Sequence, residues 1–285
     1  MITFTNSLTQ AQSSAWPSRD ILLIDTETGP GVLETALAYT SALQMADSAI
    51  LFKYTAKSVG MKHGIIPSFM AKPWGKLPGC SGHVHVSLRD ESGRNIFAVS
   101  DSELKEGRSN AAFEDTKFVS QIAEWFLAGI LDGIADGMLQ TCPHHFPTLR
   151  TTFGYTIRST RSGADMNPYF ALSAIFALGL RGIEKKLPLT IPPMSQLTPE
   201  DKELGQIKLL PTSLETATER FMGLGSTARE VFEPDFVDHY GGTREHEVKL
   251  WNEAVTDWEG ACHSVAISTP KRLMNSAVER YLELA

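Results

Sequence analysis

The stretch that decides the fold is Lys72–Ser87, KPWGKLPGCSGHVHVS. Its second half alternates histidine and valine, which predicts a strand with one polar and one apolar face. On such a strand His83, His85 and Ser87 share a face, because side chains repeat every second residue. Imidazole is a common metal ligand, and a hydroxyl can bind a phosphate oxygen. A structural or surface role for the same pattern remains an open alternative.

The first half of this stretch is a loop with closely spaced prolines and glycines. Small residues such as Gly79 let backbone N–H groups approach an anion closely. Lys72 stands at the start of the loop and adds a positive charge. The loop is therefore a candidate site for a phosphate or carboxylate, although an ordinary strand connection has the same composition.

A second candidate is Glu27–Glu34, ETGPGVLE, in which two carboxylates flank a turn rich in glycine and proline. Mg²⁺ and Mn²⁺ prefer oxygen ligands, and a turn can aim Glu27 and Glu34 at one point. The alternative is that both are solvated surface glutamates.

Hydrophobic periodicity predicts an α+β fold, with a few strands in the first third and mostly helices afterwards. Residues 1–20 are rich in Ser, Thr and Gln and are predicted as an irregular lead-in. Strands are predicted at 21–25, 65–73 and 83–90, the last with a hairpin partner at 95–100. Helices are predicted at 34–62, 113–140, 167–187, 213–222, 227–232, 244–258 and 271–284, with a loop at 188–212 and Gly241-Gly242 as a separator.

Composition excludes several classes of protein. The 285 residues are 42% hydrophobic and 21% charged, with a net charge of −7. A mildly acidic chain argues against nucleic acid and anionic membrane surfaces as partners, since both call for basic patches. No apolar run is long enough to span a membrane, and the N-terminus has no apolar signal core, so a cytoplasmic location is expected. Three widely spaced cysteines, Cys80, Cys142 and Cys262, are expected to be reduced.

Together these motifs resemble the glutamine synthetase family. KPWGKLPGCSGHVHVS is similar to its ATP-region signature, and ETGPGVLE to its Glu…Pro-Gly-Gln-x-Glu segment. Residues 163–186, GADMNPYFALSAIFALGLRGIEKK, are similar to its Asn-Pro-Tyr helix. The resemblance covers residues of about 25–140, 163–188 and 210–258. Its motifs are more similar to those of the bacterial-type and γ-glutamylpolyamine synthetases. It implies a catalytic domain with antiparallel strands flanked by helices, assembled as a homo-oligomer.

The resemblance also implies chemistry. ATP would phosphorylate the γ-carboxylate of glutamate, and ammonia or a small amine would displace the phosphate, with Mg²⁺ or Mn²⁺ neutralising charge. Matched one by one, Glu27 and Glu34 correspond to ligands of the metal nearest glutamate, and His83 to a ligand of the metal on the phosphates. Positions that would bind ATP or glutamate are Tyr39 beside adenine, Lys72, His85 and Ser87 near the phosphates, and Gly79 at glutamate.

Several family features have no counterpart in this sequence. The chain starts shortly before Glu27, so we expect the family's β-grasp domain and an early Glu-x-Glu pair to be absent. Residues 141–162 contain no Asp or Glu, and Arg158 stands where the family has a metal-binding glutamate. Residues 260–277 interrupt the family's C-terminus. We therefore expect a partial catalytic domain over 21–285, without an assigned catalytic residue, that acts as an impaired ligase. The alternative is a non-catalytic relative that binds nucleotide weakly or only associates with family subunits.

Overall fold

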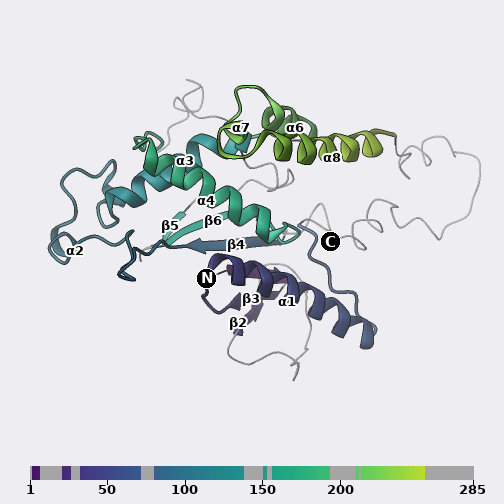
Figure 1. The fold of residues 1–285 in the computed structure, drawn as a ribbon. Coiled ribbons are helices and arrows are strands. Elements are labelled where there is room, and N and C mark those ends of the chain that lie inside the picture. Colours follow the sequence, from purple (N-terminus) through teal and green to yellow (C-terminus); the bar gives the residue numbers. More distant parts are fainter. Residues whose placement is uncertain are drawn as a thin grey trace, which may run out of the picture.

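The computed structural model describes residues 2–6, 21–26, 33–71, 80–137, 150–152, 156–192, 210–211 and 213–253 (Figure 1). Within these ranges one sheet has the strand order β2-β3-β1-β4-β6-β5, and every neighbouring pair is antiparallel. Its strands are β1 (Ile2–Asn6), β2 (Ile21–Thr26), β3 (Leu33–Leu37), β4 (Ser81–Val86), β5 (Arg150–Thr152) and β6 (Thr156–Gly163).

Five of the described helices, α3, α4, α6, α7 and α8, stack on one another on one side of β4 and β6, and α1 lies beside β3 (Figure 1). In Figure 1, α3 and α4 lie side by side over β4 and β6, and α6, α7 and α8 lie beyond them. The helices are α1 (Ala42–Lys62), α2 (Glu103–Glu106), α3 (Gln121–Gly137), α4 (Pro168–Glu184), α6 (Leu214–Met222), α7 (Thr227–Val231) and α8 (Pro234–Glu253), with a 3₁₀ turn at Glu114–Thr116. No helix among the described residues is long and apolar enough to cross a membrane.

The predicted irregular lead-in is wrong at Ile2–Asn6, which form β1 between β3 and β4. Ile2-Thr3-Phe4-Thr5 alternates apolar and polar residues, a strand pattern that the Ser- and Thr-rich surroundings obscure. The rest of the segment, residues 7–20, lies outside the described residues.

The predicted helix at 34–62 is also partly wrong. Leu33–Leu37 form β3, which pairs with β1 and β2, and the helix begins only at Ala42. Ala36 and Leu37 are apolar and fit either a helix or a strand. Pairing with β1 on one edge and with β2 on the other stabilises the strand. The strand predicted at 21–25 is confirmed as β2.

Two predicted strands are shorter than expected or missing. Residues 65–71 are irregular, with Pro67 unable to donate a ladder hydrogen bond, and 72–73 lie outside the described residues. The strand predicted at 83–90 is β4, Ser81–Val86. Its predicted hairpin partner at 95–100 is reduced to an isolated bridge between Arg89 and Asn95, because Asp90–Arg94 close a tight turn.

Later in the chain, two more predictions need correction. No strand is predicted within 141–162, yet β5 and β6 extend the sheet beside β4. Gly241-Gly242 was expected to separate two helices, yet α8 runs through it. A Cβ at Gly241 would lie 2.4 Å from Met222 Sδ, so this glycine serves close packing of α8 on α6 rather than a break.

The helices α4, α6 and α7 agree with prediction, whereas the short α2 was not predicted. Asn167 caps α4 by accepting hydrogen bonds from Tyr169 and Phe170, with Pro168 in the first turn. The helices α6 and α7 begin after the capping residues Ser213 and Ser226. The helix predicted at 113–140 begins later, at Gln121, after the 3₁₀ turn. The predictions for 138–140, for 254–258 and for 271–284, and most of the loop at 188–212, lie outside the described residues.

Two glycines allow α3 and α4 to touch backbone to backbone. A Cβ at Gly129 would lie 2.2 Å from the carbonyl oxygen of Leu178, and one at Gly182 would lie 2.1 Å from the carbonyl oxygen of Trp125. Backbone atoms cannot move aside as a side chain can. This contact therefore sets how closely the helix pair packs, and with it the apolar layer behind β4.

We predict that Gly129→Ala lowers the free energy of unfolding by about 3 kcal/mol, because the helices must separate to admit the methyl group. Urea denaturation followed by circular dichroism measures it. Gly242→Ala in α8 is the matched control, since its Cβ meets nothing within 4 Å, and it should be neutral or slightly stabilising. Equal effects of the two changes would contradict the backbone contact.

Lys53 of α1 ties that helix to the turn before α4. Its Nζ donates to the carbonyl oxygen of Met166 at 2.9 Å and lies 5.4 Å from the ring centroid of Phe69. Burial lowers the pKa of Lys53 from 10.5 to about 8, and nearby Asp165 opposes this fall. A few residues along, Tyr169 Oη donates to Asp47 Oδ1 at 2.5 Å, so α1 and α4 are joined at two points.

The lowered pKa of Lys53 predicts a pH dependence. Between about pH 8 and 10.5 the unfolded chain binds this proton and the folded chain does not, so stability rises with pH across that window. Relative to Lys53→Met, the wild type should gain about 1–2 kcal/mol between pH 8 and pH 10. Urea denaturation at both pH values measures it, with Lys62→Met at the exposed end of α1 as control. Parallel pH profiles for wild type and Lys53→Met would contradict it.

Candidate functional site

The candidate site is centred on Glu34 and His83, which come from strands that are not neighbours. In the register of β1, Thr5 lies opposite Glu34 and Thr3 opposite His83. These β1 positions are two apart, so the positions opposite them belong to one face of the sheet. The side chains reach across the width of β1, and Glu34 Oε1 lies 3.5 Å from His83 Nδ1.

The opposite face of β4 explains why this face is available for polar groups. Val84 and Val86 are 1% and 5% exposed and belong to the main core with Leu37 and Phe126. The histidines alternate with these valines and are only partly buried. The predicted two-faced strand is therefore confirmed over β4, with the imidazoles away from the helical layer.

His85 and Ser87 continue the polar face towards the end of β4. Arg158 of β6 lies directly opposite His85 in the antiparallel register. Ser87 is the first residue after the strand and is half-buried. Beyond the Glu34–His83 pair, the polar face therefore continues through His85, with the backbone of Arg158 beside it, to Ser87.

Tyr39 lies two residues beyond the end of β3, and its side chain is 54% exposed. The guanidinium carbon of Arg89 lies 5.5 Å from its ring centroid, a cation–π contact. Arg89 is itself exposed and follows β4 by three residues. An aromatic ring and a cation thus meet where β3 and β4 end.

Three predicted site residues, Glu27, Lys72 and Gly79, lie outside the described residues. The ends of the loop that holds Lys72 and Gly79 are nevertheless fastened. Cys80 N donates to the carbonyl oxygen of Ala71 at 2.7 Å, and Ala164 N donates to the carbonyl oxygen of Cys80 at 3.2 Å. The Cys80 thiol is buried and free, and burial, with a smaller effect of Asp165, raises its pKa. It therefore stays protonated and unreactive at neutral pH; Cys142 and Cys262 lie outside the described residues.

The distance between the Glu34 and His83 side chains is compatible with two ligands of one divalent cation. Ligand atoms about 2.1 Å from one ion at right angles lie about 3.0 Å apart, close to the observed 3.5 Å. A carboxylate suits Mg²⁺ and Mn²⁺, and imidazole is a common second ligand. In the part of the chain that the structure describes, no three His, Cys, Asp or Glu side chains form a group able to hold a metal.

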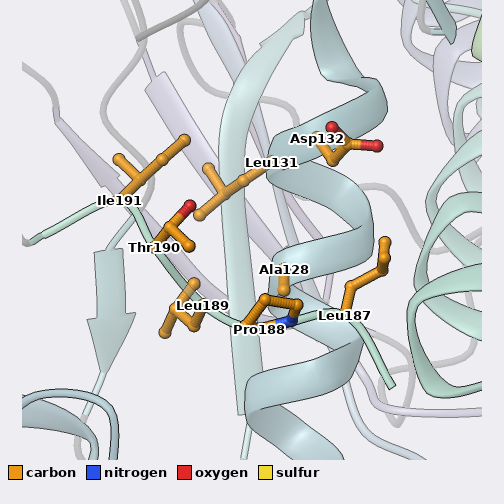
Figure 2. Close-up of a pocket in the computed structure, with 8 residues that line it drawn as sticks. All are labelled: Ala128, Leu131, Asp132, Leu187, Pro188, Leu189, Thr190 and Ile191. Atoms are coloured by element: carbon orange, nitrogen blue, oxygen red, sulfur yellow. The ribbon is translucent and has the colours of Figure 1, made fainter. Parts of the chain in front are cut away.

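A cavity of about 240 Å³ lies elsewhere, between α3 and the segment that follows α4 (Figure 2). None of the predicted site residues lines it, and its acidic group, Asp132, is paired with Arg181 at 2.8 Å. A hollow lined mainly by aliphatic residues, whose one carboxylate is paired with an arginine, offers little to a nucleotide, so we do not assign the site to it. Its lining residues are Ala128, Leu131, Asp132, Leu187, Pro188, Leu189, Thr190 and Ile191.

Sequence reasoning missed Arg89 and did not place Arg158 beside His85. Arg89 stands two residues after Ser87, and the pattern His-x-His-x-Ser-x-Arg would have placed it next on the same face. Arg158 was noted only as standing where the family has a metal-binding glutamate, and no local pattern places it beside His85. Only the pairing of β4 with β6 brings these two positions together.

Comparison with known proteins identifies the family of this chain. The family model described as "Glutamine synthetase, catalytic domain" matches residues 19–148 and 157–263. "Type-1 glutamine synthetase 2" of Dictyostelium discoideum is 34% identical over 90% of this chain and 51% of its own length. "Glutamate--isopropylamine ligase" of a Pseudomonas species is 31% identical over 82% of this chain and 54% of its own. The chain thus spans about half the length of these relatives.

Solved structures show the same fold at low sequence identity. "Apo GmaS without ligand" superposes with a TM-score of 0.69 and 18% identity, covering 93% of this chain and 72% of that one. "GmaS/ADP complex-Conformation 1" gives 0.69 and 21%, covering 86% and 60%. The architecture described above is therefore that of the glutamine synthetase catalytic domain, and this chain belongs to the glutamine synthetase family.

Proposed function

We propose that this chain carries the metal and nucleotide half of an ATP-dependent carboxylate–amine ligase of glutamine synthetase type. The observation that supports it most is the approach of Glu34 and His83 to 3.5 Å across an intervening strand. Two polar side chains reach this distance from separate strands only where the register and the face of both are right. A divalent cation held there, with Glu27 as a further ligand, would neutralise phosphate charge.

The proposed nucleotide site runs along the strands. Because β1 is antiparallel to both β3 and β4, those two strands are parallel to each other and end on the same side. Glu34 and His83 hold the phosphate end, His85 and Ser87 follow, and Tyr39 with Arg89 lies at the end for the base. In this arrangement His85 and Ser87 donate hydrogen bonds to phosphate oxygens, and Tyr39 offers its exposed ring for stacking.

The proposed reaction joins glutamate to an amine. The γ-carboxylate attacks the terminal phosphorus of ATP, ADP leaves, and the amine nitrogen then displaces phosphate from the acyl phosphate. Relatives of this chain carry the names "Glutamate--isopropylamine ligase" and "Gamma-glutamylethanolamide synthetase GlnA4", the latter from Streptomyces coelicolor and 30% identical. We propose ammonia or a small amine as the acceptor, with Gly79 and Lys72 of the adjoining loop at the acid substrate and the phosphates.

We further propose that turnover by this chain is low. Arg158 lies opposite His85 at the position for which the resemblance implies an acidic metal ligand. An arginine in place of a carboxylate removes one ligand and its negative charge from the proposed metal site. Loss of one well-placed electrostatic group typically costs a factor of about 10²–10³ in rate.

A second candidate is a non-catalytic relative that binds nucleotide or associates with family subunits. It is favoured by the described donor set, in which two side chains converge and no group of three does. Residues 21–285 would then form one partial domain, with 141–162 and 260–277 as its departures from the family. The cytoplasmic location is likewise a prediction from composition.

For the metal and phosphate end, we predict that His83→Ala and Glu34→Ala each weaken MgATP binding about tenfold or more, since each removes a charged or metal-binding group. Isothermal titration calorimetry measures the affinity. His63→Ala and Glu106→Ala, at exposed positions outside the site, are the matched controls. Unchanged affinity in both site variants would remove the basis of the nucleotide proposal.

Formation of γ-glutamyl hydroxamate from glutamate, hydroxylamine and ATP separates the two candidates. A slow wild-type rate that His83→Ala abolishes supports the ligase. MgATP binding without product, under both Mg²⁺ and Mn²⁺, supports the non-catalytic candidate.

For the base end, we predict that Tyr39→Ala weakens ATP binding about tenfold, because stacking of a base on an aromatic ring contributes about 1–3 kcal/mol. Binding of tripolyphosphate, which has no base, should not change. Tyr39→Phe keeps the ring and is the matched control, and competition calorimetry measures all three. Equal losses for ATP and tripolyphosphate would show that Tyr39 does not contact the base.

A further inference from the structure

The two ends of the loop that the proposed function assigns to the acid substrate meet at one junction in the fold. Ala71 precedes this loop and Cys80 follows it, and Cys80 N donates to the carbonyl oxygen of Ala71 at 2.7 Å. Ala164 N, just after β6, donates to the carbonyl oxygen of Cys80 at 3.2 Å. Segments that are distant in the sequence are therefore joined where the loop begins and ends.

Gly163 brings the end of β6 against the segment that precedes the loop. In the register of β4 and β6 it lies opposite Ser81, the first residue of β4. A Cβ at Gly163 would lie 2.8 Å from the Cβ of Ala71, and closer still to Asp165 Oδ1. A side chain at this position would displace Ala71 or Asp165, so the close approach at the junction requires glycine.

Lys53 of α1 joins the same junction. Its Nζ donates to the carbonyl oxygen of Met166 at 2.9 Å, and Met166 N donates back to the carbonyl oxygen of Gly163 at 3.1 Å. The same Nζ lies 5.4 Å from the ring centroid of Phe69, which is fully buried just before the loop. One ammonium group thus contacts both the turn that holds Cys80 and the segment that leads into the loop.

The charges at the junction act on one another. Burial lowers the pKa of Lys53 to about 8, Asp165 opposes this fall, and Lys57 adds to it. Burial also raises the pKa of the Cys80 thiol, and Asp165 raises it further. A single carboxylate therefore influences both Lys53 and the residue at the end of the loop.

We propose that Lys53 is a positioning residue for the acid substrate, because it fastens both ends of the loop that carries Lys72 and Gly79. This inference rests on the proposed function, which assigns that loop to glutamate and the phosphates. In this role Lys53 acts through Met166 and Phe69 rather than by contact with the substrate. Small displacements of positioning groups matter, since about 1 Å of misplacement can cost about 10²-fold in rate.

The metal and phosphate end of the site has separate supports. His83 lies opposite Thr3 in the pairing of β4 with β1, and its neighbour Val84 is buried in the core with Phe126 of α3. These contacts hold His83 without Lys53. Loss of the Lys53 contacts should therefore weaken the binding of glutamate and spare that of MgATP, whereas a general loosening of the fold would weaken both.

Isothermal titration calorimetry of the full chain at pH 7 tests the proposal, with glutamate in the presence of MgADP, which prevents turnover, and with MgATP alone. Lys53→Met should weaken glutamate binding about tenfold and change the affinity for MgATP by less than about threefold, because it removes a charge-assisted hydrogen bond at the loop ends only. Gly163→Ala should do the same by displacing Ala71. Lys62→Met and Gly242→Ala are the matched controls, and both should bind as the wild type does.

Hydrogen exchange without any ligand tests the junction itself. The amides of Cys80 and Ala164 should exchange about tenfold faster in Lys53→Met than in the wild type, because the turn that they share is no longer fastened. Amides of α6 and α8 should exchange at the wild-type rate.

The outcomes separate this inference from the proposed function. If the wild type binds both ligands, a Lys53→Met chain that binds glutamate equally well, or that exchanges the Cys80 amide at the wild-type rate, overturns the inference alone. Equal losses for glutamate and MgATP in a variant that circular dichroism shows to be folded overturn it as well. A wild type that binds neither ligand overturns the proposed function, and the inference with it. A wild type that binds MgATP without glutamate overturns the role of the loop and therefore that of Lys53.

Discussion

Pairing of β1 with both β3 and β4 is the constraint on which the candidate site depends. The two ligand-bearing strands do not touch, and β1 sets both their separation and their relative register. Strands in a sheet lie about 4.8 Å apart, so Glu34 and His83 start about 10 Å apart and meet only through their side chains. A slip of one residue in either pairing would turn one of them to the opposite face.

The helical layer holds that register from behind. Val84 and Val86 pack into the same core as Phe126 of α3 and Leu178 of α4. The backbone contact at Gly129 and Gly182 keeps these two helices close, so the apolar face of β4 meets a tightly packed surface. Since the valines cannot leave the core without large cost, the alternating histidines are held on the other face.

Polar and apolar groups thus lie on opposite faces of the sheet. One face of the sheet carries carboxylate, imidazole and hydroxyl groups, and the other is buried under α3 and α4. The outer side of α1 exposes Leu43, Ile50, Tyr54 and Met61. Lys53 of the same helix fastens α1 to the turn from which α4 begins. Membership of the glutamine synthetase family accounts for the sheet and the helical layer.

The sequence by itself determined those helices and strands whose characteristic residue pattern lies within a few consecutive residues. The alternation in HVHV identified β4, Asn167-Pro168 identified the start of α4, and the helical pattern identified α6 and α7. The ETGPGVLE and HVHVS motifs also named Glu34 and His83 as candidates and placed the chain in its family.

Tertiary structure decided what depends on partners distant in the sequence. Whether Leu33–Leu37 are strand or helix, whether Ile2–Asn6 are ordered, and whether 156–163 form a strand all depend on a neighbouring strand to pair with. Likewise, Gly241 continues α8 because Met222 packs against it. The 3.5 Å approach of Glu34 to His83 has the same origin, because a distance across a third strand is a property of the sheet and of no single segment.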